Sequence, residues 1–224
     1  MVANVDRALI LSALDGDFNP RRLERYLGLA LASGVAPLVV LTKADRVAPE
    51  ERERCEAIAR ALLPGLEVRV ADPRSPAAGA LLAPCLAPGE TVVLLGSSGV
   101  GKSTLVNTLA GAPLRRTGEV RQRDGKGRHT TTERTLIPLP GGACVIDTPG
   151  LRTIAFAASE SELPLFAEIE ALAVDCRFRD CRHESEPGCA VRAAAEEGRL
   201  DRERLAHFRK LRAELAAARR ARER

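Results

Sequence analysis

Residues 96–103 read GSSGVGKS and lie between an apolar run, ETVVLLG (90–96), and a helix-like stretch, STLVNTLA (103–110). They fill the pattern G-x-x-x-x-G-K-[ST], in which a glycine-rich turn leads from a strand into a helix. Backbone N–H groups of such a turn point at phosphate oxygens, and the helix N-terminus adds positive potential. The alternative is a chance glycine-rich turn, which the flanking strand and helix disfavour. The stretch therefore predicts a phosphate-binding loop, with Lys102 reaching the β- and γ-phosphates and Ser103 as a Mg²⁺ ligand.

A second motif, TKAD at residues 42–45, ends the apolar run PLVVLTKAD (37–45). Asp45 can accept hydrogen bonds from both guanine N1–H and the exocyclic amine, while Lys43 lies along the base. Adenine lacks that pair of donors and would leave the carboxylate unpaired. Thr42 stands where Asn is commoner, which we interpret as a tolerated variant. The motif predicts a loop that recognises guanine, and hence GTP and GDP as ligands.

A third motif, DTPG at residues 147–150, ends the run ACVIDTPG (143–150). Asp147 is expected to hold the Mg²⁺ shell through water, and the Gly150 N–H is expected to meet the γ-phosphate. Together with TKAD, this motif favours a GTPase over other phosphate-loop proteins. A phosphate-loop kinase of small molecules is disfavoured because both motifs would then be coincidences.

The order of the three motifs is unusual, because the phosphate loop comes first in ordinary GTPases and here TKAD precedes it. A GTPase domain cut between its third and fourth strands, with its old ends joined, has the order base loop, phosphate loop, switch I and DTPG. Such a permutation keeps the contacts and the sheet unchanged. The order therefore predicts a circularly permuted GTPase domain. A Ser-Ala loop for the base should follow LEVRVA (66–71), but ADPRSP (71–76) matches it poorly, so that contact is unassigned.

The apolar runs and the helix-like segments alternate along the first part of the chain, which predicts an α/β domain with a mainly parallel, doubly wound sheet. Pro140, Gly141 and Gly142 predict a hairpin-like turn between neighbouring strands. The six expected strands lie in residues 5–14, 37–45, 66–71, 90–96, 135–140 and 143–150. The expected helices lie in residues 19–34, with Asn19 as N-cap, and in residues 49–63, 76–86 and 101–110.

Strand patterns end after residue 158, and we therefore expect a permuted GTPase domain over 1–158 and a helical domain over 159–224. The second part contains CRFRDCRHESEPGC (176–189), with three thiols and an imidazole at short spacing. Such a Cys₃His set predicts a structural Zn²⁺ site without an open coordination position. The alternative is reduced cysteines in a small core. The predicted zinc ligands are Cys176, Cys181, His183 and Cys189, whereas His207 is interpreted as a helix-surface residue.

Bulk properties place the chain among ordinary globular proteins. It has 224 residues, of which 29% are charged and 45% hydrophobic, with a formal charge of +4. The mild positive charge permits an acidic partner such as nucleic acid but does not require one. The first residues resemble a strand rather than a signal peptide, and no apolar run reaches the length that crosses a bilayer. We expect a cytoplasmic protein without a membrane partner.

The permuted motifs, GRHTTT (127–132) and the spacing Cys-x₄-Cys-x-His-x₅-Cys together resemble the RsgA (YjeQ) family of bacterial ribosome-biogenesis GTPases. The resemblance covers nearly the whole chain. It implies a GTPase that acts late in maturation of the small ribosomal subunit and contacts its rRNA, with hydrolysis stimulated by the subunit. We expect the protein to be a monomer. Family members usually carry an N-terminal OB-fold domain, whereas this chain begins almost at the first strand of the GTPase domain. The alternative function is an rRNA-binding assembly scaffold in which GTP only shapes the surface.

The same resemblance implies the roles of individual residues. Switch I is expected to supply Thr131 to Mg²⁺, with Thr130 as the alternative. Leu151 follows DTPG where many GTPases have a Gln that orients the attacking water, so His129 is expected to position that water, unless it only caps its loop. His129 and Lys102 are the predicted catalytic residues. The predicted nucleotide-binding residues are Thr42, Lys43, Asp45, Gly96, Ser97, Ser98, Gly99, Val100, Gly101, Lys102, Ser103, Thr104, Thr131, Asp147 and Gly150.

The segment PLRRTGEVRQRDGKGRHTTTER (113–134) is a candidate for rRNA contact, because its basic residues outnumber its acidic ones. A flexible, solvated loop is the equally weighted alternative. The basic end of the chain leaves the same two interpretations open.

Overall fold

The computed structural model describes residues 4–114, 135–147 and 164–220. Six strands form one sheet in the order β3-β2-β1-β4-β6-β5. All neighbouring strands are parallel except β5 and β6, which pair antiparallel. The strands are β1 (Arg7–Ala13), β2 (Ala36–Thr42), β3 (Glu67–Val70), β4 (Thr91–Leu95), β5 (Thr135–Pro138) and β6 (Cys144–Asp147). The predicted α/β fold with a mainly parallel sheet is confirmed.

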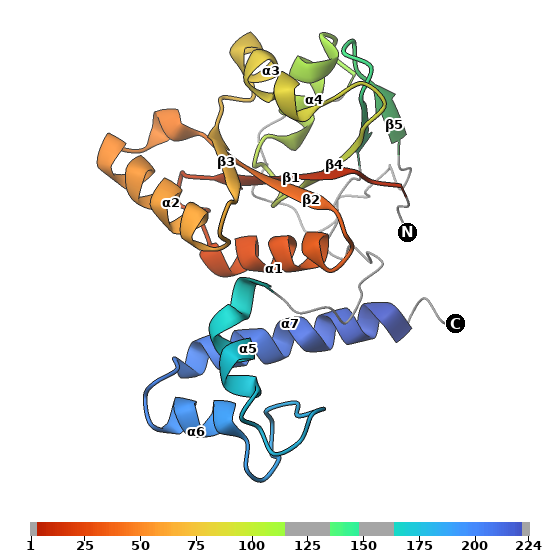
Figure 1. Ribbon diagram of the computed structural model, residues 1–224. Helices are drawn as coiled ribbons and strands as arrows, with labels where there is room; N and C mark the ends of the chain where they lie inside the picture. Colours follow the sequence, from red (N-terminus) through yellow and green to blue (C-terminus); the bar gives the residue numbers. More distant parts are fainter. Residues whose placement is uncertain (1–3, 115–134, 148–163, 221–224) are drawn as a thin grey trace, which may run out of the picture.

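Helices cover both faces of this sheet (Figure 1). Ile10 of β1 packs in the cluster that includes α1 and α2, whereas Leu9 and Leu11 pack in the cluster with α3 and α4. Successive side chains of a strand point to opposite faces of the sheet, so one buried strand contributes side chains to the apolar cluster on each face. The helices on the two faces are α1 (Pro20–Leu31), α2 (Pro49–Ala61), α3 (Pro76–Leu82) and α4 (Lys102–Ala110), with short 3₁₀ turns η1 (Ala44–Arg46) and η2 (Ala83–Cys85).

Local sequence explains where these elements begin and turn. The side chain of Asn19 accepts a hydrogen bond from the backbone N–H of Arg22, and Pro20 occupies the first turn of α1, as its sequence predicts. The antiparallel pair is closed by a turn in which the Gly142 N–H donates to the Leu139 carbonyl at 2.9 Å. The hairpin predicted from the Pro-Gly-Gly run is therefore confirmed.

The strand order explains the order of the motifs. β4, which leads into the phosphate loop, lies in the middle of the sheet, with β1, β2 and β3 on one side and β6 and β5 on the other. β1 pairs in parallel with both β2 and β4, so the base loop after β2 and the phosphate loop after β4 emerge at the same edge. This arrangement brings two motifs together at one end of the sheet although the base loop precedes the phosphate loop in the chain.

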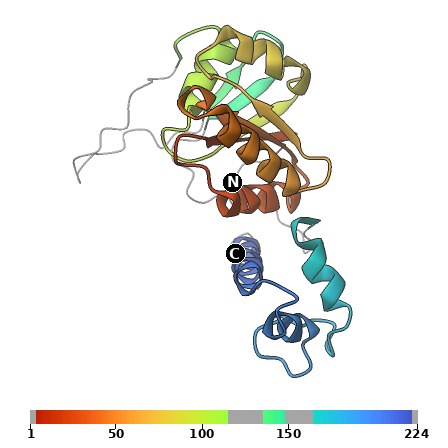
Figure 2. The ribbon, with the colours of Figure 1, turned by 90° about the vertical axis from the view of Figure 1, so that its left-hand side faces the viewer.

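The C-terminal part is helical and packs against α1, below it in Figures 1 and 2. A Cβ atom added to Gly28 of α1 would lie 2.6 Å from the Leu211 side chain, so the helices approach closely because this residue is glycine. One apolar cluster continues from α1 into the C-terminal helices. The elements are η3 (Pro164–Phe166), α5 (Ala167–Ala173), α6 (Ala190–Glu196) and α7 (Arg202–Arg220). The expected boundary at residue 158 lies outside the described residues, so the division into 1–158 and 159–224 stays a prediction.

The interpretation of His207 as a helix-surface residue is wrong. Its side chain is only 13% exposed, and its Nδ1 lies 2.8 Å from a carboxylate oxygen of Glu24, itself buried in α1. Arg204 also pairs with Glu24 and places its guanidinium 4.3 Å from the centre of the Phe166 ring. A periodic helical sequence does not reveal which face meets another helix, and here α7 meets α1.

Within the residues that the structure describes, no helix combines the length and the apolar character that spanning a bilayer requires.

Candidate functional site

The phosphate loop, residues 96–101, connects β4 to α4 and lies against neighbouring loops. Gly96 has a φ of 142°, and a Cβ atom there would lie 2.5 Å from the carbonyl oxygen of Leu11 in β1. Gly101 has a φ of 106°, and a Cβ atom there would lie 2.9 Å from the ring of Pro73. Both positions therefore require glycine, for backbone conformation and for space. Ser98 and Gly99 form the exposed tip, whereas Val100 is buried.

Two polar side chains at this loop, Lys102 and Ser97, have partners within the fold. The Lys102 ammonium donates to the carbonyls of Gly96 at 2.8 Å and Ser97 at 2.6 Å, so its charge lies inside the loop. The Ser97 hydroxyl donates to the carboxylate of Asp17, which follows β1. Ser103 and Thr104 follow Lys102 in the first turn of α4. The arrangement concentrates positive charge and backbone N–H groups where phosphate would bind.

Thr42 connects the two loops directly. It is the last residue of β2 and is fully buried, and its hydroxyl donates to the carbonyl of Val100 at 2.9 Å. The contact fixes the start of the base loop against the phosphate loop. A hydroxyl thus suffices for this contact, which supports the interpretation of Thr42 as a tolerated variant.

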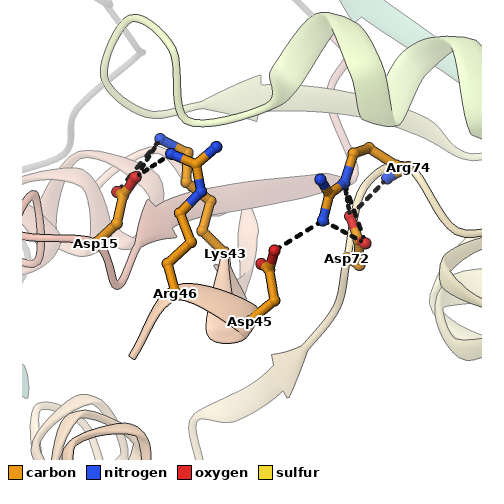
Figure 3. A network of polar contacts seen from close by, with 6 residues as sticks. All are labelled: Asp15, Lys43, Asp45, Arg46, Asp72 and Arg74. Carbon is orange, nitrogen blue, oxygen red and sulfur yellow. Dashed lines mark hydrogen bonds and ion pairs between the residues drawn. The ribbon is translucent and has the colours of Figure 1, made fainter. Parts of the chain in front are cut away.

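Lys43 is held by an acidic residue that the sequence analysis did not single out. It adopts a left-handed backbone conformation, with a φ of 58°, and its ammonium donates to both carboxylate oxygens of Asp15 at 3.2 and 3.0 Å. Arg46 donates to one of the same oxygens at 3.0 Å (Figure 3). Asp15 follows β1, the strand beside β2, so the sheet brings the loops after β1 and β2 together.

Asp45 has a partner from a third loop, the one that follows β3. Its carboxylate accepts from Arg74 at 2.9 Å, and Arg74 also donates to Asp72, as Figure 3 shows. Hydrogen bonds from the Arg74 side chain, ahead of the one from its backbone N–H, lower the pKa of the Asp72 carboxyl below its ordinary value. The loop ADPRSP, whose match to a Ser-Ala loop is poor, therefore does lie beside the residue expected to recognise the base.

Several predicted site residues lie outside what the structure describes. His129, Thr130, Thr131, Gly150 and Leu151 fall in the ranges 115–134 and 148–163. Asp147 is the last residue of β6, so its backbone lies beside the strand that leads to the phosphate loop. The expected roles of all these residues stay predictions.

The cysteine cluster predicted in the C-terminal part does come together. One ligand atom each from Cys176, Cys181, His183 and Cys189 lies within 4.8 Å of the others. Nδ1 of His183 is 3.6 Å from the Cys176 sulfur and 3.4 Å from the Cys189 sulfur, and these two sulfurs are 3.9 Å apart. Tetrahedral Zn²⁺ with bonds of about 2.3 Å to sulfur and about 2.0 Å to nitrogen requires ligand separations of about 3.5 to 3.8 Å. The separations among Cys176, His183 and Cys189 are close to these values, and Cys181 supplies a fourth donor within 4.8 Å of the others, so the chemistry of the set suits a tetrahedral metal ion.

Neighbouring groups hold the backbone of this cluster in place. The Arg209 guanidinium donates to the carbonyl of His183, and Glu186 accepts three backbone N–H bonds of its own loop. These N–H bonds, led by that of Arg182, lower the pKa of Glu186 to about 2. Burial, ahead of the positive charge of nearby Arg212, lowers the pKa of His183 and so favours the neutral imidazole that a metal requires.

Two solved structures have a similar fold, and one of them is described as circularly permuted. The structure described as "The crystal structure of YloQ, a circularly permuted GTPase" is 28% identical and covers 96% of this chain and 69% of that one, with a TM-score of 0.63. A structure of YjeQ from Thermotoga maritima, at 24% identity and a TM-score of 0.63, covers 96% of this chain and 73% of that one and shows the same fold.

Curated relatives are closer in sequence, and each is named Small ribosomal subunit biogenesis GTPase RsgA. The relative from Xylella fastidiosa (strain 9a5c) is 54% identical over 218 residues, which are 97% of this chain and 64% of the relative. The relative from Xanthomonas oryzae pv. oryzae (strain MAFF 311018) is 51% identical over 221 residues, 97% of this chain and 60% of the relative. This chain thus spans a little under two thirds of the length of these relatives. Residues 1–157 match the family described as RsgA GTPase, and the chain belongs to that family.

Proposed function

We propose that this chain is a GTPase that binds GTP and GDP with Mg²⁺ between the phosphate loop and the base loop. The observation that carries the proposal is the buried hydrogen bond from Thr42 to Val100. It connects the loop suited to phosphate with the loop whose Asp45 is suited to guanine. The two bonded residues are 58 positions apart in the sequence, so the chain order alone does not suggest this contact. Membership of the RsgA GTPase family supports the same activity.

The nucleotide is held by residues of three motifs. Lys43 lies along the base, Lys102 pairs with the β- and γ-phosphates, and Asp147 orients the water around the metal. The full set is Thr42, Lys43, Asp45, Gly96, Ser97, Ser98, Gly99, Val100, Gly101, Lys102, Ser103, Thr104, Thr131, Asp147 and Gly150. Ser103 and Thr131 are the proposed protein ligands of Mg²⁺.

Hydrolysis depends on charge stabilisation and on positioning of the attacking water. Bound Mg²⁺ neutralises charge on the phosphates, and the Lys102 ammonium stabilises the charge that develops on the transferred phosphoryl group. Leu151 has no hydrogen-bonding group for the water, so we assign this task to His129. Switch I, which carries His129, must be ordered for this, and a partner that orders it would raise the rate.

We propose that this partner is the small ribosomal subunit with its rRNA, because the curated relatives are named for biogenesis of that subunit. The protein then acts as a cytoplasmic monomer. In the alternative function, rRNA-binding scaffold, GTP shapes the surface and hydrolysis is incidental. Release of the protein from subunits with GTP and with a non-hydrolysable analogue separates the two, because only the GTPase cycle requires hydrolysis for release.

The Cys₃His cluster is proposed to hold one structural Zn²⁺ through Cys176, Cys181, His183 and Cys189. The ligand separations support a tetrahedral ion, and all four positions are taken by protein side chains, which leaves no site for a substrate. Bound zinc would hold together the helical domain proposed over residues 159–224. Helix α7 of that domain packs against α1.

Competition binding tests the proposed function most simply. The protein should bind GDP and GTP and discriminate strongly against ADP and ATP, because adenine leaves the Asp45 carboxylate without its two donors. Equal affinity for adenine and guanine nucleotides would contradict the assignment of the base loop.

A further inference from the structure

Guanine has three groups along the edge that a protein reads: the O6 acceptor, the N1–H donor and the exocyclic amine donor. Asp45 can accept from the two donors, but O6 needs a donor from the protein. The base loop does not supply one through Asp45, since an ionised carboxylate only accepts. The loop after β3, which places Arg74 beside Asp45, is the nearest described source of that donor.

Most backbone N–H groups of this loop already have acceptors within the fold. The Ala71 N–H donates to the Leu41 carbonyl at 3.0 Å, and the Ser75 N–H donates to the Asp72 carbonyl at 3.0 Å. The Arg74 N–H donates to the Asp72 carboxylate at 3.0 Å, and Pro73 has no N–H. In the described loop, only the N–H of Asp72 is left as a backbone donor.

The Arg74 side chain, in contrast, is held next to the Asp45 carboxylate with donors to spare. Its Nε donates to both Asp72 oxygens at 2.9 and 3.1 Å, and its Nη2 donates at 2.9 Å to one oxygen of Asp72 and one of Asp45. Nη1 makes neither contact and points, in Figure 3, away from both carboxylates toward the side where Lys43 lies. Asp72 thus orients the guanidinium while leaving Nη1 available.

We propose that Arg74 is a specificity-determining residue whose Nη1 donates to guanine O6. The inference rests on the proposed function, in which Asp45 binds N1–H and the amine. Together Arg74 and Asp45 present one donor and two acceptors in a row, the complement of guanine's acceptor and two donors. A carboxylate has about four lone-pair sites, so Asp45 can keep Arg74 and still accept from the base. Adenine carries an amine in place of O6, which would face the guanidinium donors and be rejected.

The same contact allows an opposite role for Arg74. In that role the guanidinium blocks the Asp45 carboxylate and must move away before guanine can bind. The Arg74 and Asp45 side chains are 61% and 48% exposed, and ion pairs this open to solvent are weak. Such a pair is a poor barrier to a nucleotide. The two roles predict opposite signs for the effect of removing Arg74 on affinity.

The test compares GDP with 6-thio-GDP, in which a weakly accepting sulfur replaces O6. Both affinities are measured by calorimetry for the parent, for Arg74→Ala and for Arg74→Gln. We expect Arg74→Ala to bind GDP about tenfold more weakly, as loss of one hydrogen bond to a charged group implies. It should bind 6-thio-GDP almost as the parent does, so the preference of the parent for GDP over 6-thio-GDP disappears. Arg74→Gln, whose amide keeps two N–H donors, should recover part of that preference.

Arg46→Ala is the matched control, because it removes the same charge from the same network through a residue that contacts Asp15 instead. It should shift the affinities for both nucleotides by one common factor. Arg74→Ala binding GDP as tightly as the parent, or more tightly, overturns the proposal, as does a parent that does not distinguish the two nucleotides. Failure of the proposed function gives another result, a parent that binds no guanine nucleotide or binds ADP equally well. Thermal unfolding of each variant checks that the fold is retained.

Discussion

The buried hydroxyl of Thr42 donates a 2.9 Å hydrogen bond to the carbonyl of Val100, so that the base loop and the phosphate loop share one contact. Thr42→Val keeps the shape of the side chain and leaves that carbonyl unpaired. An unpaired buried polar group costs about 1 to 3 kcal/mol. We expect urea denaturation of the nucleotide-free variant to show a loss of that size, together with weaker GDP binding. Thr42→Ser, which keeps the hydroxyl, should lose much less, and equal losses in the two variants would argue against the hydrogen bond.

Asp45→Asn should convert the base preference from guanine to xanthine. The Asn amide can donate to the C2 carbonyl of xanthine, whereas guanine presents an amine there. The substitution turns the matched contact with guanine into a mismatch and the mismatched contact with xanthine into a match. Sites built on such polar contacts discriminate strongly. Competition between GDP and XDP measures the change, with Asp15→Asn as the matched variant in the neighbouring loop, which should leave the preference for guanine in place. Unchanged preference in Asp45→Asn would mean that another residue reads the base.

The fold and the binding loops could be predicted because each is encoded by a continuous stretch of sequence. The phosphate loop, the base loop and the Pro-Gly-Gly turn need no knowledge of distant residues, and six apolar runs suffice for a sheet. The partners of Lys43 and Asp45 could not be predicted in this way. Asp15 and Arg74 lie 28 and 29 residues from them along the chain, on other loops of the same sheet edge.

The same limit applies to the contact between α1 and α7. Glu24 and Arg204 are 180 residues apart, and nothing in either helical pattern shows that the two helices pack together. A charged residue on a helix is expected at the solvent face, and burial of Glu24 becomes intelligible only once Arg204 and His207 are beside it. Gly28, which permits the close approach, resembles any other small residue within an amphipathic helix.

The Cys₃His cluster should contain about one zinc ion per chain, measured by elemental analysis of the freshly purified protein. Cys181→Ser should lose the metal and unfold the C-terminal helices before the rest, because metal-binding energy there is folding energy. Hydrogen exchange of the backbone amides of α6 and α7 measures this unfolding. Cys85→Ser is the control, since Cys85 is also buried but lies outside the cluster. A metal-free parent with protected C-terminal helices, or equal behaviour of both variants, would refute the zinc assignment.

The burial of His207 beside α1 should make stability depend on pH. Burial lowers the pKa of His207 and outweighs the attraction to Glu24, which raises it, so the folded state favours the neutral imidazole. This contribution is fully present above the ordinary histidine pKa of about 6.5 and is lost as the pH falls through the lowered value in the folded state. We expect the unfolding free energy of the zinc-loaded parent to decrease on acidification from about pH 7 more steeply than that of His207→Gln. Both proteins keep His183 in the cluster, so identical slopes would exclude a role for His207.

We propose that the chain hydrolyses GTP slowly alone and faster on the small ribosomal subunit. The sequence has Leu151 after DTPG, so the isolated chain lacks the usual group that orients water, and a partner that orders His129 would supply it. Steady-state turnover of GTP with and without purified small subunits is the most direct test, with His129→Ala measured in parallel. We expect subunits to raise parent turnover strongly and His129→Ala to lose most of that stimulation. Parent turnover that is the same with and without subunits would contradict stimulation by the subunit.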